Sequence, residues 1–245
     1  MKLRHAALSL LILSGLAQAA DERDPAALAA LSAMGSYLQG LPSFSLSTRS
    51  ETDQQLESGQ TVAFQHHTQV LAVRPDKLYV NVDRGGSSRR FFYDGKDFVL
   101  YDQHLNYYTR EAAPDSIGKL LDLLGERYGI ELPLADLFRW SATTADEVGI
   151  SAAYSIGKEH LDGQSCVHYA YRQPQIDWQL WVREGAQPLP CRLMITRRDD
   201  AERPRHSVSF AWDLTSPIKA DAFTFVPPAK ALPVPLVQLD AGERP

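Results

Sequence analysis

Two serine residues are each followed three positions later by a lysine, as Ser116 with Lys119 and Ser155 with Lys158. In penicillin-binding enzymes an S-x-x-K pair supplies a serine nucleophile, but those enzymes also carry S-D-N and K-T-G motifs. This sequence has neither companion motif, and it has no G-x-S-x-G turn for a serine hydrolase. We therefore interpret Ser116 as a helix start and Ser155 as a strand residue, and we assign no catalytic residue.

Histidines are the next residues that could do chemistry, as ligands of a metal ion. His66 and His67 are adjacent, so on a strand they point to opposite faces and only one of them can join a site. His104 lies in a predicted turn, and no H-E-x-x-H motif is present. We interpret all three as surface polar residues, and we expect no metal site and no cofactor.

Carboxylates near the second half of the chain could supply an acid–base pair, namely Asp177, Glu184, Asp199 and Asp200. Nothing in their spacing fixes the distance between any two of them. The segment 83–90 contains a glycine pair and an arginine pair that could hold an anion, but it is typical of a solvated hairpin tip. The sequence therefore predicts a protein that is not an enzyme.

The first nineteen residues are typical of a secretory signal peptide. Lys2 and Arg4 form a basic start, residues 6–16 are mostly apolar, and Ala17-Gln18-Ala19 supplies small residues at the two positions read by a signal peptidase. We expect cleavage after Ala19 and a periplasmic protein. A membrane anchor is the alternative, but the run is too short to span a bilayer.

The charge of the chain argues against a nucleic-acid partner, and its hydropathy argues against a membrane-spanning segment after the leader. The whole chain has 25 basic and 30 acidic residues, and removal of residues 1–19 takes away two of the basic ones. No basic stripe is left for a nucleic acid, so we expect no such partner. The longest apolar run lies in the leader, so we expect no later segment to span a membrane.

Cys166 and Cys191 are the only cysteines. In an oxidising compartment an isolated pair is first interpreted as a disulfide, which would close a loop of 25 residues. The alternative is two free buried thiols, because strands on either side of a third strand lie about 10 Å apart, beyond bonding reach. A bond then requires the middle strand to stop short.

Apolar periodicity gives the order of the elements. Asp24 and Pro25 are typical of an N-cap and a first helical residue, and an apolar stripe then continues to Leu38, with Gly40 as the stop. Period-two alternation follows from Phe44 to Tyr108, with turns at residues 57–60, 83–88, 94–95 and 102–105. A leucine-rich insert at 114–139 is predicted to be helical. Period two returns from Tyr154 to Trp212.

The predicted fold is mainly antiparallel β with a few helices. A twisted antiparallel sheet of this length curls, and the N-terminal helix and the insert at 114–139 are the segments available to cover its apolar concave face. We expect one domain over residues 20–228, followed by a proline-rich mobile tail at 229–245. Trp178 and Trp181 lie three apart on a predicted strand, so they face opposite ways.

Four stretches together carry a resemblance to a known family: Arg74-Pro75-Asp76-Lys77-Leu78, Tyr93-Asp94-Gly95-Lys96-Asp97 with Tyr101-Asp102, Trp178-Gln179-Leu180-Trp181 before Pro188-Leu189-Pro190, and Phe223-Thr224-Phe225 with Pro227-Pro228. With the leader and the first helix, the chain resembles an uncharacterised family of predicted periplasmic bacterial proteins. That family is similar to the lipoprotein-localisation factors of the LolA/LolB-like superfamily.

The resemblance implies a half-open curved β-barrel closed by helices over an apolar cavity that takes acyl chains. In the carrier proteins the arginine of the R-P step bonds to the helical lid, and Arg74 is the matching residue here. The implied partner is a hydrophobic ligand or a lipidated protein. The alternative is a non-enzymatic envelope module with a filled core, which meets a protein partner transiently or senses envelope stress.

Overall fold

The first helix begins where the sequence predicts it. In the computed structural model, which describes residues 22–239, helix α1 spans Pro25–Gly40 and the Asp24 carboxylate accepts a hydrogen bond from the Ala26 amide at 2.8 Å. Its buried stripe includes Leu31, Met34 and Leu38. The predicted signal peptide at 1–19 lies outside the described residues.

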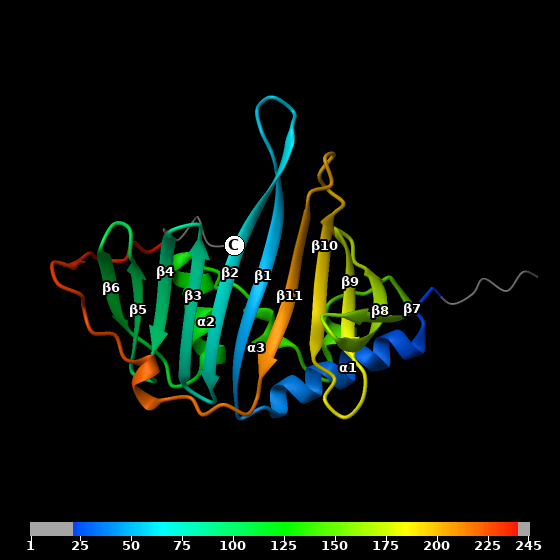
Figure 1. The fold of residues 1–245 in the computed structure, drawn as a ribbon, viewed down its shortest axis with the longest axis horizontal. Helices are drawn as coiled ribbons and strands as arrows, with labels where there is room; N and C mark the ends of the chain where they lie inside the picture. Colours follow the sequence, from blue (N-terminus) through cyan, green and yellow to red (C-terminus); the bar gives the residue numbers. More distant parts are fainter. Residues whose placement is uncertain (1–21, 240–245) are drawn as a thin grey trace, which may run out of the picture.

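Six antiparallel strands follow as a meander in which each strand pairs with the next. They are β1 (Ser43–Gln55), β2 (Thr61–Val73), β3 (Lys77–Arg84), β4 (Ser87–Tyr93), β5 (Asp97–Asp102) and β6 (Tyr107–Ala112). The predicted turn after Tyr93 is closed by the Asp94 carboxylate, which accepts hydrogen bonds from the amides of Lys96 and Asp97. Strands β1 and β2 are the longest, and their hairpin extends beyond the rest of the sheet (Figure 1).

The insert between the two groups of strands is helical, as predicted. It contains α2 (Ile117–Tyr128), α3 (Asp136–Arg139) and α4 (Thr144–Glu147). Ser116 caps α2 by accepting from the Lys119 amide, and Gly129 ends it in the left-handed conformation that glycine adopts without strain. Helix α4 lies beyond residue 139, where the predicted insert ends. It was not predicted because it is a single polar turn, which has no apolar periodicity in the sequence.

A second antiparallel meander completes the sheet. It contains β7 (Ala152–Leu161), β8 (Gln164–Arg172), β9 (Ile176–Arg183), β10 (Pro190–Arg197) and β11 (Arg205–Asp213). Strand β11 pairs antiparallel with β1, so the two meanders form one sheet in the order β12-β6-β5-β4-β3-β2-β1-β11-β10-β9-β8-β7.

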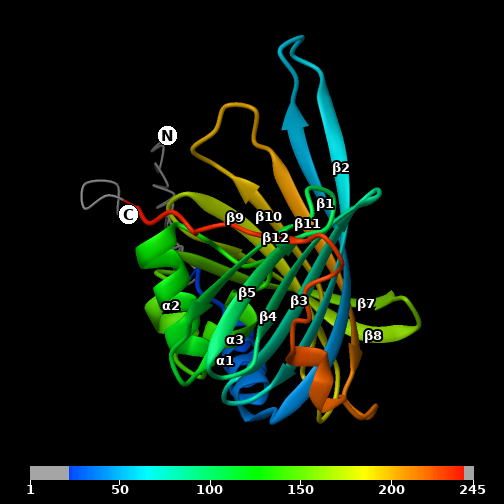
Figure 2. The same cartoon turned by 90° about the vertical axis from the view of Figure 1, so that its left-hand side faces the viewer.

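The sheet curves, and α1, α2 and α3 lie on one of its faces (Figure 2). One large hydrophobic cluster fills the space between that face and the helices. The fold class predicted from the sequence, an open curved antiparallel sheet covered by an N-terminal helix and a central insert, is confirmed. We call the helix-covered face of the sheet the inner wall, and the opposite face the outer face.

After a short 3₁₀ turn, η1 (Ala220–Phe223), the C-terminal segment runs along the β6 edge of the sheet (Figure 2). Its Phe225 ring packs on the outer face against Phe92, Tyr101 and Tyr108. Strand β12 (Leu232–Pro233) then pairs parallel with β6. This part of the chain is extended and its backbone bonds to β6; residues 240–245, the end of the tail predicted to be mobile, lie outside the described residues.

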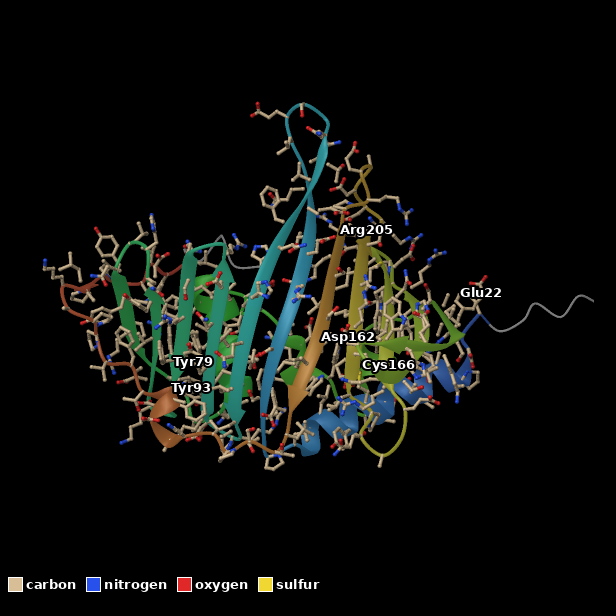
Figure 3. All side chains as sticks on the ribbon, viewed as in Figure 1. Glu22, Tyr79, Tyr93, Asp162, Cys166 and Arg205 are labelled. Atoms are coloured by element: carbon tan, nitrogen blue, oxygen red, sulfur yellow. A yellow bond between two sulfur atoms is a disulfide. The ribbon has the colours of Figure 1, made fainter. Side chains whose placement is uncertain are left out.

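The disulfide between Cys166 and Cys191 is present, with Cα atoms 6.7 Å apart. The two cysteines come from β8 and β10, with β9 between them. The bond is within reach because β9 ends at Arg183, which is the residue paired with Cys166, and because the β9–β10 register shifts next to Cys191. The middle strand therefore stops short, which was the condition predicted for bonding. Cys166 is labelled in Figure 3.

Candidate ligand-binding site

The inner wall is apolar over its lower part, the part nearest α1 in Figure 1. Period-two alternation puts every second residue of each strand on this face. The wall crosses the sheet from β5 to β8 without interruption. Its buried residues include Phe44, Leu46, Val70, Ala72, Leu78, Val80, Phe91, Tyr93, Phe98, Tyr171, Trp178, Leu180, Val182, Leu193, Val208 and Phe210.

Helical side chains from two separate parts of the chain cover this wall. They are Leu31, Met34 and Leu38 of α1, Ile117, Leu120 and Leu124 of α2, and Leu137 of α3, all of them almost completely buried. Phe138 adds a ring contact with Phe44 of the wall, at 5.7 Å between centroids. In this structure the protein's own side chains therefore fill the space between sheet and helices, so a guest molecule needs the helical cover to move.

Arg74 lies between the wall and the cover. Its guanidinium donates a hydrogen bond to the Leu38 carbonyl at the end of α1, at 3.3 Å. It also lies 5.4 Å from the centroid of the Phe138 ring in α3. Burial lowers the pKa of this guanidinium. One side chain directly after β2 thus contacts both helical segments.

Two tyrosines make further bonds between wall and cover that the sequence did not predict. The Tyr93 hydroxyl donates to the Pro114 carbonyl, where the insert begins. The Tyr171 hydroxyl donates to the Ala27 carbonyl of α1 at 2.8 Å. Burial raises the pKa of Tyr93 to about 12 and raises the pKa of Tyr171 further, so both hydroxyls keep their protons and act as donors. Tyrosines in a strand pattern resemble ordinary core residues, so no sequence signal marked them.

Close packing of α1 against the insert occurs at Gly35. A Cβ atom built on this glycine would overlap the carbonyl oxygen of Ser141. A glycine inside a helical pattern was the available sequence signal, since it usually has a packing reason there.

A hollow of about 430 Å³ lies between α2 and α3 on the helical side. Leu121, Ile130 and Leu134 share its lining with the solvent-exposed carboxylates Asp122, Glu126, Glu131 and Asp136. Desolvation raises the pKa of Asp136, Arg139 lowers it, and Glu131 raises it. A second hollow of about 310 Å³ lies between Ser45, Leu71 and the segment 216–222.

The residues considered for serine or metal chemistry stand apart from one another. Ser116 caps α2 and Ser155 lies on edge strand β7, as interpreted from the sequence. His67 pairs with Asp83 across the strands, next to His66, and His104 lies in the β5–β6 turn. Within residues 22–239 there is no group of three or more His, Cys, Asp or Glu side chains that could hold a metal ion.

The four candidate carboxylates have different partners instead of facing one another. Asp177 is surrounded by arginines, Glu184 bonds to Lys158 and Ser165, and Asp199 pairs with Arg197. The fourth, Asp200, accepts the Glu202 amide in the β10–β11 turn. Hydrogen bonds and charge from these partners lower the pKa of Asp177, Glu184 and Asp199, which is typical of structural ion pairs.

The tryptophans three apart in β9 do face opposite ways. Trp178 belongs to the inner wall and stacks on Tyr171 at 4.2 Å. Trp181 lies on the outer face beside the cystine, stacks on His168, and donates its indole N–H to Glu159.

No helix among the described residues is long and apolar enough to cross a membrane.

Solved structures similar to this chain have low sequence identity. LppX, a lipoprotein from Mycobacterium tuberculosis, is 15% identical, with 81% of this chain and 100% of that chain covered and a TM-score of 0.46. LprF from Mycobacterium bovis is 14% identical, with 85% and 99% covered and a TM-score of 0.47. A LolA superfamily protein from Nitrosomonas europaea is 10% identical, with 81% and 97% covered and a TM-score of 0.38.

Among curated proteins, none matches the sequence. One family model does match, over residues 27–237, and that range includes the inner wall, the helical cover and the cystine. Its description is "Predicted periplasmic protein (DUF2092)". The chain belongs to this family of predicted periplasmic proteins, as its sequence resemblance implied.

Proposed function

We propose that this protein binds a hydrophobic ligand, the acyl chain of a lipid or of a lipidated protein, against the inner wall of its sheet. The observation that carries the proposal is the wall itself, an apolar surface continuous from β5 to β8 and covered by helices rather than by a second sheet. A site for acyl chains needs an apolar shape and few polar groups, in agreement with the composition of this wall.

Ligand binding in this proposal replaces helical side chains on the wall with the acyl chain. Burial of a 16-carbon chain contributes about 12 kcal/mol, at about 0.8 kcal/mol for each methylene. Leu31, Met34 and the other cover residues already shield the wall from water. The binding free energy is therefore the free energy gained when the acyl chain covers the wall minus the free energy lost when these side chains leave it. The bonds of Arg74, Tyr93 and Tyr171 set how readily the cover moves.

We propose export to the periplasm with cleavage after Ala19, in keeping with the family description. N-terminal sequencing of the protein from a periplasmic fraction tests this, and a first residue other than Ala20 would contradict it. We also propose a binding protein and not an enzyme, since the candidate serines and carboxylates have structural partners.

The test of acyl-chain binding uses residues 20–245, purified without detergent. Native mass spectrometry and solvent extraction should find a bound amphiphile, and a fluorescent fatty acid should bind saturably. Two valines give a matched pair of variants, because Val80 lies buried on the inner wall and Val99 lies buried on the outer face. Val80→Thr should weaken fatty-acid binding severalfold, whereas Val99→Thr should cost similar stability and leave binding unchanged.

Absence of any amphiphile after extraction, together with no binding of the fluorescent fatty acid to the wild type, would refute the proposal. Equal losses for Val80→Thr and Val99→Thr would place the binding elsewhere than on the inner wall.

The filled interior favours a second candidate function, that of a protein-interaction module. Strand β7 is the edge strand of the sheet on the side of β8, and it exposes Tyr154 (47%) and Ile156 (57%). A module of this kind needs no internal ligand and binds its partner at an exposed apolar edge. Ile156→Ser should then abolish binding of an envelope partner, while Leu105→Ser, an equally exposed leucine in the β5–β6 turn, should not.

A further inference from the structure

Above its apolar part, the inner wall changes to polar residues. On β1 the inward positions run Phe44, Leu46, Thr48, Ser50 and Thr52, from apolar to hydroxyl side chains. On β2, Thr68 and His66 face the same way, whereas β11 stays apolar at Phe210 and Val208 and becomes polar only at His206. We call these six residues the polar band: Thr48, Ser50, Thr52, His66, Thr68 and His206.

Cross-strand pairing places the polar band across the middle of the sheet. Thr48 is paired with Thr68, Ser50 with His66, and Thr52 with His206. The Thr52 hydroxyl and the His206 Nδ1 form a hydrogen bond of 2.7 Å. Arg205, the neighbour of His206, marks this height in Figure 3, at the upper end of β11 and opposite to Tyr93 at the lower end of the wall. The band therefore separates the apolar wall below from the long hairpin above.

A buried donor lies further along the sheet, on β9, beyond the apolar side chain of Ile195. His206 is paired with Ile195, and Ile195 with Trp178, so Trp178 lies two strands from His206, or about 10 Å. Trp178 is only 6% exposed, and its indole N–H has no hydrogen-bond partner among the described residues. A buried donor without an acceptor costs about 1–3 kcal/mol, so an acceptor brought by a ligand is favoured there.

The hydroxyls of the polar band and the Trp178 indole carry no charge. Burial is the main factor that lowers the pKa of His66 and His206, and the charge of nearby Arg84 lowers the pKa of His66 as well, which keeps the imidazoles uncharged at neutral pH. Neutral donors suit a carbonyl oxygen better than a phosphate, for which guanidinium forks are the usual partners. Beyond the band, Phe64 of the hairpin is 43% exposed on the same face.

We propose that the Trp178 indole donates to the carbonyl at the junction of an acylated ligand, an ester or an amide, while the acyl chain lies on the apolar wall and the polar groups beyond the carbonyl face the polar band. This inference rests on the proposed function and specifies its ligand as an uncharged acyl ester or acyl amide. The remainder of the ligand leaves the site at the upper end, along the inner side of the β1–β2 hairpin.

The test measures how well three probes displace a bound fluorescent fatty acid: hexadecane, methyl palmitate, and an N-palmitoyl tripeptide amide. Wild type should prefer the two carbonyl probes to hexadecane, and the stronger of the two tells whether lipid esters or acylated proteins are the source. Trp178→Phe keeps an aromatic ring but removes the indole N–H, so the preference should fall about three- to tenfold with hexadecane unchanged. Thr52→Val should weaken only the N-palmitoyl tripeptide amide, whose polar groups extend beyond the carbonyl to the polar band.

Trp181→Phe is the matched control, because this indole N–H already has Glu159 as its acceptor and lies on the outer face. It should lower the melting temperature without changing the probe preference. Trp178→Phe leaves a small cavity but removes an unpartnered buried donor, so its melting temperature should fall no more than that of Trp181→Phe.

An unchanged preference in Trp178→Phe would overturn the carbonyl site while acyl binding stands, and unchanged displacement by the tripeptide amide in Thr52→Val would overturn the role of the polar band. Failure of all three probes to displace the fatty acid from wild type would instead overturn the ligand class, and failure of the fatty acid itself to bind would remove the proposed function with it.

Discussion

Gly35 of α1 packs directly against the backbone of Ser141 in the insert, so closely that a Cβ atom would lie 2.6 Å from the Ser141 carbonyl carbon. This contact joins the two helical segments that cover the inner wall, although they lie far apart in the sequence. The two helical segments can therefore pack this closely only if residue 35 is a glycine.

Gly35→Ala is expected to destabilise the fold. Alanine is about 1 kcal/mol better than glycine inside a helix, but the overlap with Ser141 costs about 1–3 kcal/mol or more because backbone must move. Gly125→Ala in α2 is the matched control, since a Cβ there meets no atom within 4 Å, and it should stabilise by about 0.5–1 kcal/mol. Denaturant unfolding of both variants checks the opposite signs; a Gly35→Ala protein as stable as wild type would show that the segments do not pack as described.

Arg74→Leu is expected to loosen the helical cover and to change ligand uptake. The variant loses a charged hydrogen bond to Leu38, worth about 1.5–3 kcal/mol, and the contact with Phe138. Hydrogen exchange should rise in α3 and at the end of α1. Arg139→Leu, which removes an exposed ion pair with Asp122 inside the insert, should cost no more than about 1 kcal/mol. Unchanged uptake and unchanged stability in Arg74→Leu would remove Arg74 from the site.

Loss of the cystine is expected to lower stability by about 3 kcal/mol, the chain-entropy value for its loop of 25 residues. The double variant Cys166→Ala with Cys191→Ala should unfold at lower denaturant than wild type, and a reductant should lower only the wild-type midpoint. A wild-type midpoint that does not respond to reductant under unfolding conditions would mean that the two thiols are free in the purified protein.

Asp136→Asn is expected to stabilise the protein slightly at neutral pH. Desolvation by the surrounding insert raises the folded-state pKa of Asp136 above its ordinary value of 3.8, and the solvent contact of the side chain limits this effect, so the folded protein holds this proton only somewhat more tightly than the unfolded chain does. The charged carboxylate therefore opposes folding above the folded-state pKa, and this cost disappears as the pH falls below 3.8. Melting curves at about pH 7 and below 3.8 should show a gain for the Asp136→Asn variant only at the higher pH. Asp122→Asn, which breaks the exposed pair with Arg139, should show no gain at either pH.

The sequence was sufficient for most of the fold because the signals were local. Asp24, Pro25 and the leucine stripe define α1, Asp94-Gly95 defines a hairpin, and period two along β1 assigns Phe44 and Leu46 to the covered face. The three-residue spacing of Trp178 and Trp181 likewise placed them on opposite faces.

What could not be predicted depends on contacts between distant segments. The Tyr171 bond to Ala27 joins residues 144 positions apart, and no pattern within either segment marks it. Strand β12 is two residues long and pairs parallel through Leu232, so it has no period to detect. The filling of the interior depends on where Met34, Leu120 and Leu137 meet the wall, which only the folded arrangement shows.

Both margins of the sheet are bordered by short lengths of the same chain. At β7 the backbone of Glu22 and Asp24 bonds to Ala153, and the Asp24 carboxylate accepts the Ser155 amide. At β6 the amides of Leu232 and Val234 donate to Asn106 and Tyr108. An unpaired edge strand of an open sheet can pair with a strand of another molecule and cause aggregation. These few residues occupy part of each edge and so oppose such pairing. Removal of either length would leave the strands of the inner wall paired and would expose a free strand edge to other molecules.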